Sequence, residues 1–426
     1  MKRIIMLFSG LTFCFSMFAD KYTEMAQKHL DWIKAGQADS VLAHSDVELR
    51  TMLPAAAIQS VWPRFVAQIG ELKEQKEWKR STKDKHEVCK TTLVFEKESL
   101  CFLATFDTAM RLVGVSFVPA SEVADEANTE KPLPDGVEER KFAVKHGKVN
   151  LPGKLTLPKG VEGDVPVVVL VHGSGPNDMD ESVGPNRPFR DLAVGLAQKG
   201  IAVLRYDKRT KVYGNRTAEV SGGKLNYDSE SVDDALQALR QVEKLPGIDA
   251  KRVYVLGHSL GGMLLPRIAV RSELKLAGLI ALAAAARPLD QMMYEQVMYI
   301  SQAYGQTADS AQVTAREFVK KMNSMLPTEY KAMQKTYDPF ATVKRLKNKP
   351  MLFLQGTHDY QVTEEDLGLW KKALTENPNA QFTVMKDLDH LFRKLPRMAL
   401  PADYEQAGTM SDEAIAAVAR FVLDSH

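Results

Sequence analysis

Uninterrupted apolar runs separated by helical segments are the feature that most restricts how this chain can fold. A strand that is apolar on both faces must be covered on both faces, which is typical of a parallel sheet between two layers of helices. The runs are residues 165–171, 202–204, 253–256, 279–282 and 351–354. Helices are expected between them, at 189–198, 229–242 and 261–270. The C-terminal part of the chain is therefore predicted to have an α/β fold, with a mostly parallel sheet flanked by helices.

A short turn motif joins one of these strands to the helix that follows it. Residues 257–261 read G-H-S-L-G and connect the apolar strand 252–256 to an apolar helix. In a G-x-S-x-G turn the serine sits on a bend so sharp that the residues two positions away must lack side chains. The bend lifts the hydroxyl clear of the sheet at a helix N-terminus, where negative charge is favoured. A plain strand-to-helix turn is the alternative, but the flanking strand and helix favour Ser259 as a nucleophile.

A serine nucleophile needs a base and an acid, which follow such a turn in the chain order serine, acid, histidine. Asp359 comes directly after the buried strand 350–356 and is the predicted acid. Asp290 is its competitor, but it falls at the entry of the helical segment that follows the strand 279–282. Two further carboxylates, Asp387 and Asp389, follow a different strand.

The predicted general base is identified by its position in the chain. Only His390 and His426 follow the last expected strand, 381–385. His426 ends the chain beyond the last helix, where ordering is weak, so His390 is the predicted base. His258, inside the turn motif, and His358, next to the acid, are equally compatible with partly buried structural histidines.

Two backbone donors are expected to stabilise the oxyanion of a tetrahedral intermediate. The N–H of Leu260, directly after the nucleophile, is the first. The second is the N–H of Ser174 in the loop 172–176, H-G-S-G-P, which ends the strand 165–171. A purely structural glycine-rich turn is the alternative. Both loops follow parallel strands, and ligands of open α/β sheets bind at the carboxyl ends of the strands.

Five ordered motifs resemble one branch of the α/β-hydrolase superfamily. They are residues 172–178, 188–192, 204–210, 257–262 and 359–362. The branch contains exported bacterial carboxylesterases described as EstD-like or serine-aminopeptidase-like, some of which carry a small N-terminal domain of unknown function. The resemblance covers roughly residues 142–426. It implies a triad of Ser259, His390 and Asp359 and esterase activity on short acyl esters, and it does not specify the natural ester.

The predicted function is that of a serine carboxylesterase acting on a small-molecule ester, without a metal or an organic cofactor. The sequence lacks Cys/His metal-ligand spacing, a P-loop and a G-x-G-x-x-G motif. A peptidase, thioesterase or acyltransferase would use the same triad, and an envelope- or carbohydrate-binding protein with a vestigial site is a more distant alternative. Lys and Arg number 56 against 54 Asp and Glu, so the net charge of +2 gives no reason to expect a nucleic-acid partner.

Two segments of the C-terminal part have open interpretations. Residues 287–346 interrupt the strand–helix alternation and are expected to form a helical lid. The six methionines between 287 and 340 either line an adaptable acyl pocket or pack as ordinary core. The charged stretch 205–209, R-Y-D-K-R, is interpreted as an internal ion-pair network in preference to a substrate contact.

A second, smaller domain is expected ahead of the α/β part. Helical segments followed by strands at 89–95, 101–106 and 112–118 predict a small α+β domain over 20–118. Residues 119–139 hold seven acidic residues, one lysine and three prolines, and are interpreted as a linker. The catalytic domain is accordingly expected over 140–426.

The first nineteen residues resemble an export signal. Lys2 and Arg3 precede an apolar run from 4 to 18, and Ala19 precedes a polar pair. The run is shorter than the roughly twenty residues that a membrane-spanning helix needs, so cleavage after Ala19 and a periplasmic or extracellular location are expected. A lipoprotein processed at Cys14 is the alternative.

Two cysteines remain after such cleavage, Cys89 and Cys101. A hairpin centred on residues 96–99 places Cys101 opposite Val94, too far from Cys89 for a disulfide. Two buried thiols are therefore expected in preference to a bond, although export would permit one.

Overall fold

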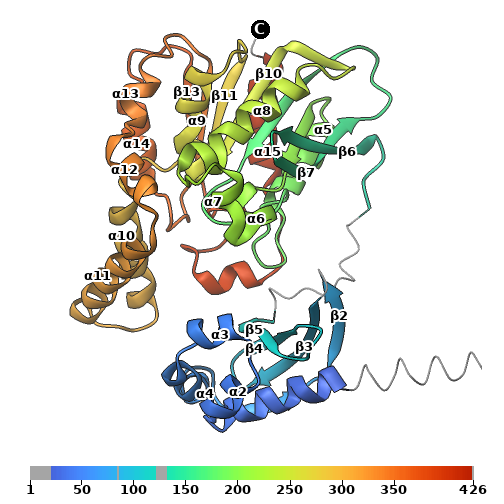
Figure 1. Cartoon of the computed structure of the whole chain (residues 1–426). Helices are drawn as coiled ribbons and strands as arrows, with labels where there is room; N and C mark the ends of the chain where they lie inside the picture. Colours follow the sequence, from blue (N-terminus) through green and yellow to red (C-terminus); the bar gives the residue numbers. More distant parts are fainter. Residues whose placement is uncertain (1–20, 84–85, 121–131, 425–426) are drawn as a thin grey trace, which may run out of the picture. The chain divides into compact units, whose positions relative to one another are not determined.

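The structure is a computed structural model that describes residues 21–83, 86–120 and 132–424. The expected export signal at 1–19 and His426 lie outside the described residues. The chain divides into two compact units, Met1–Asn128 and Thr129–His426, and each is described by itself (Figure 1).

The first unit has the expected α+β fold. Its helices are residues 21–34, α2 (Ala38–Ala43), α3 (Val47–Met52) and α4 (Ala55–Ile69). They precede an antiparallel five-stranded sheet made of β1 (Leu72–Gln75), β2 (Lys79–Lys83), β3 (His86–Phe95), β4 (Ser99–Phe106) and β5 (Leu112–Pro119). One apolar core, to which Leu30, Val41 and Phe102 belong, holds the helices against the sheet.

The hairpin that carries the two cysteines is tighter than expected. Val94 pairs with Ser99, so Cys101 faces Thr92 and the predicted pairing with Val94 is wrong. The N–H of Phe95 donates to the carbonyl of Glu98, which leaves two residues at the tip of the turn. The two cysteines are buried and form no disulfide, as expected, and burial raises the pKa of Cys89 to about 12.

The second unit is built on an eight-stranded sheet with the order β13-β12-β11-β10-β8-β9-β7-β6. The strands are β6 (Val137–His146), β7 (Val149–Pro158), β8 (Val165–Val171), β9 (Ala202–Tyr206), β10 (Ile248–His258), β11 (Gly278–Leu282), β12 (Met351–Gly356) and β13 (Ala380–Met385). The strands from β8 onwards run parallel, and the β6–β7 hairpin is antiparallel. The mostly parallel α/β sheet predicted from the apolar runs is confirmed.

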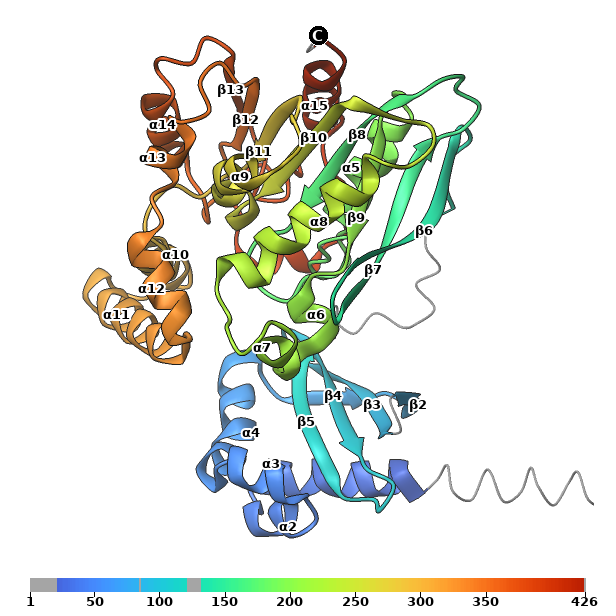
Figure 2. The ribbon, with the colours of Figure 1, turned by 45° about the horizontal axis from the view of Figure 1, so that its top comes forward.

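Alternate side chains of each central strand enter two separate cores, because successive residues of a strand point to opposite faces. The helices of this unit around the sheet are α5 (Pro188–Ala197), α6 (Arg209–Tyr213), α7 (Thr217–Val220), α8 (Asp233–Val242), α9 (Leu260–Arg271), α14 (Glu364–Ala373) and α15 (Asp412–Asp424), with single turns at η1 (Gly214–Arg216), η2 (Asp228–Val232) and η3 (Pro401–Glu405). Val167 and Val169 of β8 pack with α8, α9 and α14, whereas Val168 and Leu170 pack with α5 and α15. Figure 2 shows α8 and α9 on one face of the sheet and α5 and α15 on the other.

The linker predicted over 119–139 is too long at its C-terminal end. Residues from Val137 onwards belong to β6, and Pro119 is the last residue of β5. Glu139, interpreted as a linker carboxylate, lies 2.6 Å from the buried guanidinium of Arg205 and 3.2 Å from Lys154. An acidic residue that neutralises a buried cation is indistinguishable by composition from one in a solvated linker.

The chain leaves the sheet between β11 and β12 for the helices α10 (Leu289–Ala303), α11 (Ala308–Met325), α12 (Thr328–Thr336) and α13 (Pro339–Val343). They occupy the segment expected to be helical, 287–346. Within the described ranges, no helix combines the length and apolar character that crossing a bilayer requires.

Candidate active site

Ser259 occupies the turn between β10 and α9 in a backbone conformation that few side chains adopt. Its φ is 53°, in the left-handed region. A Cβ on Gly257 would lie 2.6 Å from the amide nitrogen of Gly262, and one on Gly261 would lie 2.7 Å from the carbonyl oxygen of His172. The glycines of the motif are therefore required by the close approach of neighbouring backbone, and the bend presents Ser259 at the carboxyl edge of the sheet.

The structure brings Asp359 and His390 together across two loops. Asp359 follows β12, and its Oδ2 lies 2.7 Å from Nδ1 of His390, with both residues buried. The other carboxylate oxygen accepts from the N–H groups of Gln361 and Val362. The carboxylate is therefore held from both sides and aimed at the imidazole.

The competing carboxylates have other partners. Asp290 lies in the first turn of α10 and accepts from the N–H of Gln291. Asp389 is buried against the guanidinium of Arg393, 2.8 Å away, and burial raises its pKa despite that cation. Asp387 lies 3.8 Å from His358. Asp359 is the carboxylate that the structure places on His390.

His390 lies next to the residue that precedes the serine. The rings of His258 and His390 are 4.5 Å apart, and Nε2 of His258 lies 2.9 Å from the carbonyl oxygen of His390. The Ser259 hydroxyl has no hydrogen-bond partner in the ranges that the structure describes. Such bonds are often long or misaligned in free enzymes and shorten when substrate binds.

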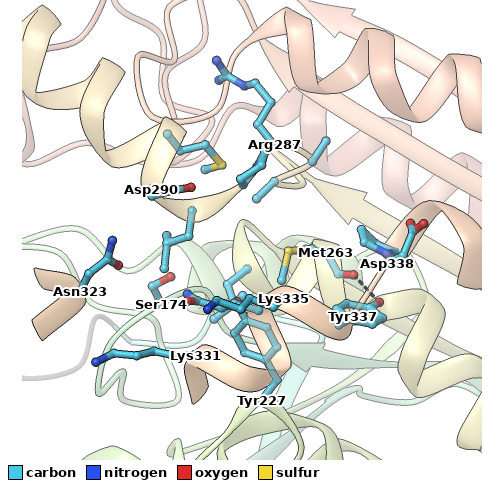
Figure 3. Close-up of a pocket in the computed structure, with 18 of the residues that line it drawn as sticks. Ser174, Tyr227, Met263, Arg287, Asp290, Asn323, Lys331, Lys335, Tyr337 and Asp338 are labelled. Carbon is cyan, nitrogen blue, oxygen red and sulfur yellow. Dashed lines mark hydrogen bonds between the residues drawn. The ribbon is translucent and has the colours of Figure 1, made fainter. Parts of the chain in front are cut away.

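The glycine-rich loop after β8 passes directly beside the serine. A Cβ on Gly173 would lie 3.1 Å from the Cβ of Ser259, and Ser174 lines the same cavity as Ser259 and Leu260 (Figure 3). Among the described residues, the N–H groups of Ser174 and Leu260 donate to no protein acceptor. The two predicted donors are thus available at one cavity.

Comparison with known proteins assigns this arrangement to a family. Residues 168–402 match the family described as "Alpha/beta hydrolase family", and the chain is 36% identical over 394 residues to the esterase EstD of Thermotoga maritima, which covers 90% of this chain and 91% of EstD. The chain belongs to the α/β hydrolase family. Residues 26–115 of this hydrolase match a second family, described as a protein of unknown function (DUF3887).

Other similarities are weaker. The hydrolase is 23% identical over 299 residues to dipeptidyl peptidase family member 2 of Caenorhabditis elegans, covering 65% of this chain and 32% of that protein. The solved structure of Est1E from Butyrivibrio proteoclasticus aligns with a TM-score of 0.45 and 17% identity, covering 67% of this chain and 98% of Est1E.

Glu181 is a buried group at the site of this hydrolase that no sequence pattern indicated. Its Oε1 accepts from the N–H of Gly173 at 2.6 Å, and its Oε2 lies 2.9 Å from Nδ1 of His258. Burial alone would raise the pKa of Glu181, but His258 and the Gly173 N–H lower it overall. Burial likewise opposes charge on His258, but Glu181 raises its pKa overall, so each residue of this buried pair favours the charged form of the other.

Lys208 binds the carbonyl group of Gly173, the glycine whose N–H donates to Glu181. Its Nζ donates to the carbonyl of Gly173 at 2.8 Å and lies 2.7 Å from Oε1 of Glu230, with Lys208 only 2% exposed. In the same charged stretch, the buried Arg205 pairs with Glu139 and Asp180, and the buried Arg209 pairs with the buried Asp234. The interpretation of 205–209 as an internal ion-pair network is confirmed.

His172, at the start of the glycine-rich loop, has no part in the acid–base pair. Burial lowers the pKa of His172 to about 4, so its imidazole is neutral at pH 7. Its ring packs 5.2 Å from that of Phe189, a contact that anchors the loop to α5.

A cavity of about 820 Å³ opens over Ser259, within the size range of small-molecule sites. Apolar side chains from α9 and the start of α10 belong to its lining: Leu260, Met263, Leu289 and Met292. Of the six methionines between 287 and 340, all of them described, Met292 alone lines the cavity. Of these six residues, only Met292 is therefore in a position to line an acyl pocket.

Proposed function

We propose that this hydrolase is a serine carboxylesterase that hydrolyses short-chain acyl esters. The observation that carries the proposal is the 2.7 Å contact between Asp359 and His390, whose ring packs against His258, the residue that precedes Ser259 on a strained turn. The name of EstD, similar over nearly its whole length, supports an ester as the substrate. The apolar side chains that line the cavity together with Ser259 suit a short acyl chain.

The proposed reaction proceeds in two half-reactions through an acyl-enzyme. Oγ of Ser259 attacks the ester carbonyl, and Nε2 of His390 accepts the hydroxyl proton. The N–H groups of Ser174 and Leu260 bind the oxyanion, and Asp359 stabilises the imidazolium. The C–O bond to the alcohol then breaks, and His390 protonates the departing oxygen. Water, deprotonated by His390, attacks the acyl-enzyme, releasing the carboxylic acid and Ser259.

The test is replacement of the nucleophile. Ser259→Ala is expected to lower kcat for para-nitrophenyl acetate and butyrate by at least about a thousandfold, with an unchanged thermal unfolding temperature. Ser272→Ala, at the opposite end of α9, is the matched control and should retain full activity. Turnover retained by the Ser259 variant would refute the proposal. Matched amides and thioesters, assayed alongside, would reveal a peptidase or a thioesterase.

A further inference from the structure

We infer that the natural substrate is an ester carrying a second, anionic group, which binds to lysines of α11 and α12. The inference rests on the proposed esterase function and names the class of ester. It arises from the charged groups that line the cavity above Ser259: Lys320 on α11, and Lys331 and Lys335 on α12.

None of these three lysines is neutralised by the protein. Within the described ranges, Lys320, Lys331 and Lys335 have neither an ion-pair partner nor a hydrogen-bond acceptor. Lys331 is half-buried, and Lys320 and Lys335 are exposed. The lining holds these three lysines against two carboxylates, Asp290 and Asp338, and Arg287 is paired with Asp366, so the lysines give the lining a net positive charge.

The other charged groups that line the cavity have ion-pair partners or backbone N–H donors. The Arg287 guanidinium binds Asp366 at 2.7 Å and contacts Glu295. Asp338 caps α13 by accepting from the N–H groups of Phe340 and Ala341 at 2.8 and 2.9 Å. Asp290 lies in the first turn of α10, where the positive end of the helix dipole offsets its charge. In the described part of the chain, neither Asp290 nor Asp338 forms an ion pair with one of the three lysines, so the lysine charge is available to a ligand.

Two of the lysines repel each other on one helix, and a bound anion would relieve that repulsion. Lys331 and Lys335 are four residues apart on α12, so they lie on one face of the helix, and like charges at this spacing destabilise a helix. Figure 3 shows Lys331 and Lys335 on the side of the cavity opposite Arg287 and Asp290. Leu260 and Met263 of α9, the helix that begins after Ser259, are apolar, so in this proposal the ester lies against α9 and its anionic group against α11 and α12. The anionic group can be a carboxylate or a phosphate, because lysine binds either of them as a point charge.

The experiment compares esters that differ only in charge. The acyl-side pair is the para-nitrophenyl monoester of adipic acid and its terminal amide; the alcohol-side pair is the acetate of para-hydroxyphenylpropanoic acid and its amide. At low salt we expect kcat/KM for the anionic member of one pair to exceed that of its neutral partner roughly tenfold. The pair that shows the preference identifies whether the anionic group is on the acyl side or the alcohol side of the ester. Competitive inhibition by added inorganic phosphate would show that the lysines also bind a phosphate as the anionic group.

Variants assign the preference to the lysines. Lys331→Gln combined with Lys335→Gln should reduce the anionic-to-neutral ratio towards one, as should about 0.5 M salt. Lys321→Gln, an exposed lysine of α11 outside the cavity lining, is the matched control and should keep the wild-type ratio. Equal kcat/KM within both pairs, or a ratio that survives the double substitution, would overturn this inference while leaving the esterase proposal intact. If none of the four esters were hydrolysed, the proposed esterase function itself would be contradicted.

Discussion

Gly173 has both of its backbone polar groups held by buried charged side chains. Glu181 accepts its N–H and Lys208 donates to its carbonyl. In a trans peptide the C=O and the following N–H point in opposite directions, so Lys208 directs the N–H of Ser174 away from itself. The proposed oxyanion donor is thereby oriented before substrate binds, which is the condition for strong electrostatic stabilisation.

Removing the Lys208 ammonium should therefore impair the chemical step more than substrate binding. For Lys208→Met we expect kcat to fall roughly tenfold to a hundredfold and KM to change less than about twofold, measured on para-nitrophenyl butyrate. Because this change leaves Glu230 buried without its cation, the double variant Lys208→Met, Glu230→Gln should show the same kcat loss with better stability.

A matched lysine separates orientation of the peptide from general stability. Lys349 also donates to a backbone carbonyl, that of Leu276 at 2.6 Å, but does not line the cavity. Lys349→Met should therefore lower the unfolding temperature without lowering kcat. An unchanged kcat in both Lys208 variants would show that Gly173 does not need this contact.

At the scale of elements, the loops after β12 and β13 are joined where β12 ends. The N–H of His358 donates to the carbonyl of Leu388 at 2.9 Å, and a Cβ on Gly356 would lie 2.8 Å from the carbonyl carbon of Leu388. The absence of a side chain at Gly356 lets the loop of Asp359 approach the loop of His390. The contact between acid and base thus depends on a residue that takes no part in the chemistry.

Gly356→Ala is expected to separate these loops and lower kcat/KM at least roughly tenfold, because small displacements of catalytic groups have large effects. The control is Gly368→Ala in α14, where a Cβ meets nothing within 4 Å and should stabilise the helix by up to about 1 kcal/mol. Esterase kinetics and urea unfolding of both variants make the comparison. Wild-type activity in the Gly356 variant would mean that the loops adjust without cost.

At the scale of the whole molecule, the boundary between the two units determines what the hydrolase part needs in order to fold. The second unit has its own cores on both faces of its sheet, and its first strand begins at Val137. Val137 is buried, and Glu139 pairs with Arg205, which is fully buried. The residues just before 140 are therefore structural parts of the hydrolase.

Two truncations test this boundary. A chain beginning at Thr129 should fold and hydrolyse para-nitrophenyl butyrate with kcat within about twofold of the full chain. A chain beginning at Arg140 lacks Glu139 and should be less stable by about 2–4 kcal/mol in urea unfolding, because a buried cation loses a partner. Equal stability of the two chains would place the boundary after Glu139, and inactivity of the longer one would show that the first unit contributes to activity.

The sequence by itself determined the class of the sheet, the turn at Ser259 and the pairing of Asp359 with His390. Apolar runs indicate strands that are buried on both faces of a sheet. The glycines of the turn are required by steric contacts with nearby backbone, and loops that follow neighbouring parallel strands meet at one edge of the sheet. Only the tertiary structure decided the partners of charged residues distant in sequence. Glu139 and Glu181 resemble surface residues in sequence, and the stretch 205–209 is recognisable as charged but not by its partners, because a buried charge is distinguished by its partner, and the partner is brought near only when the chain folds.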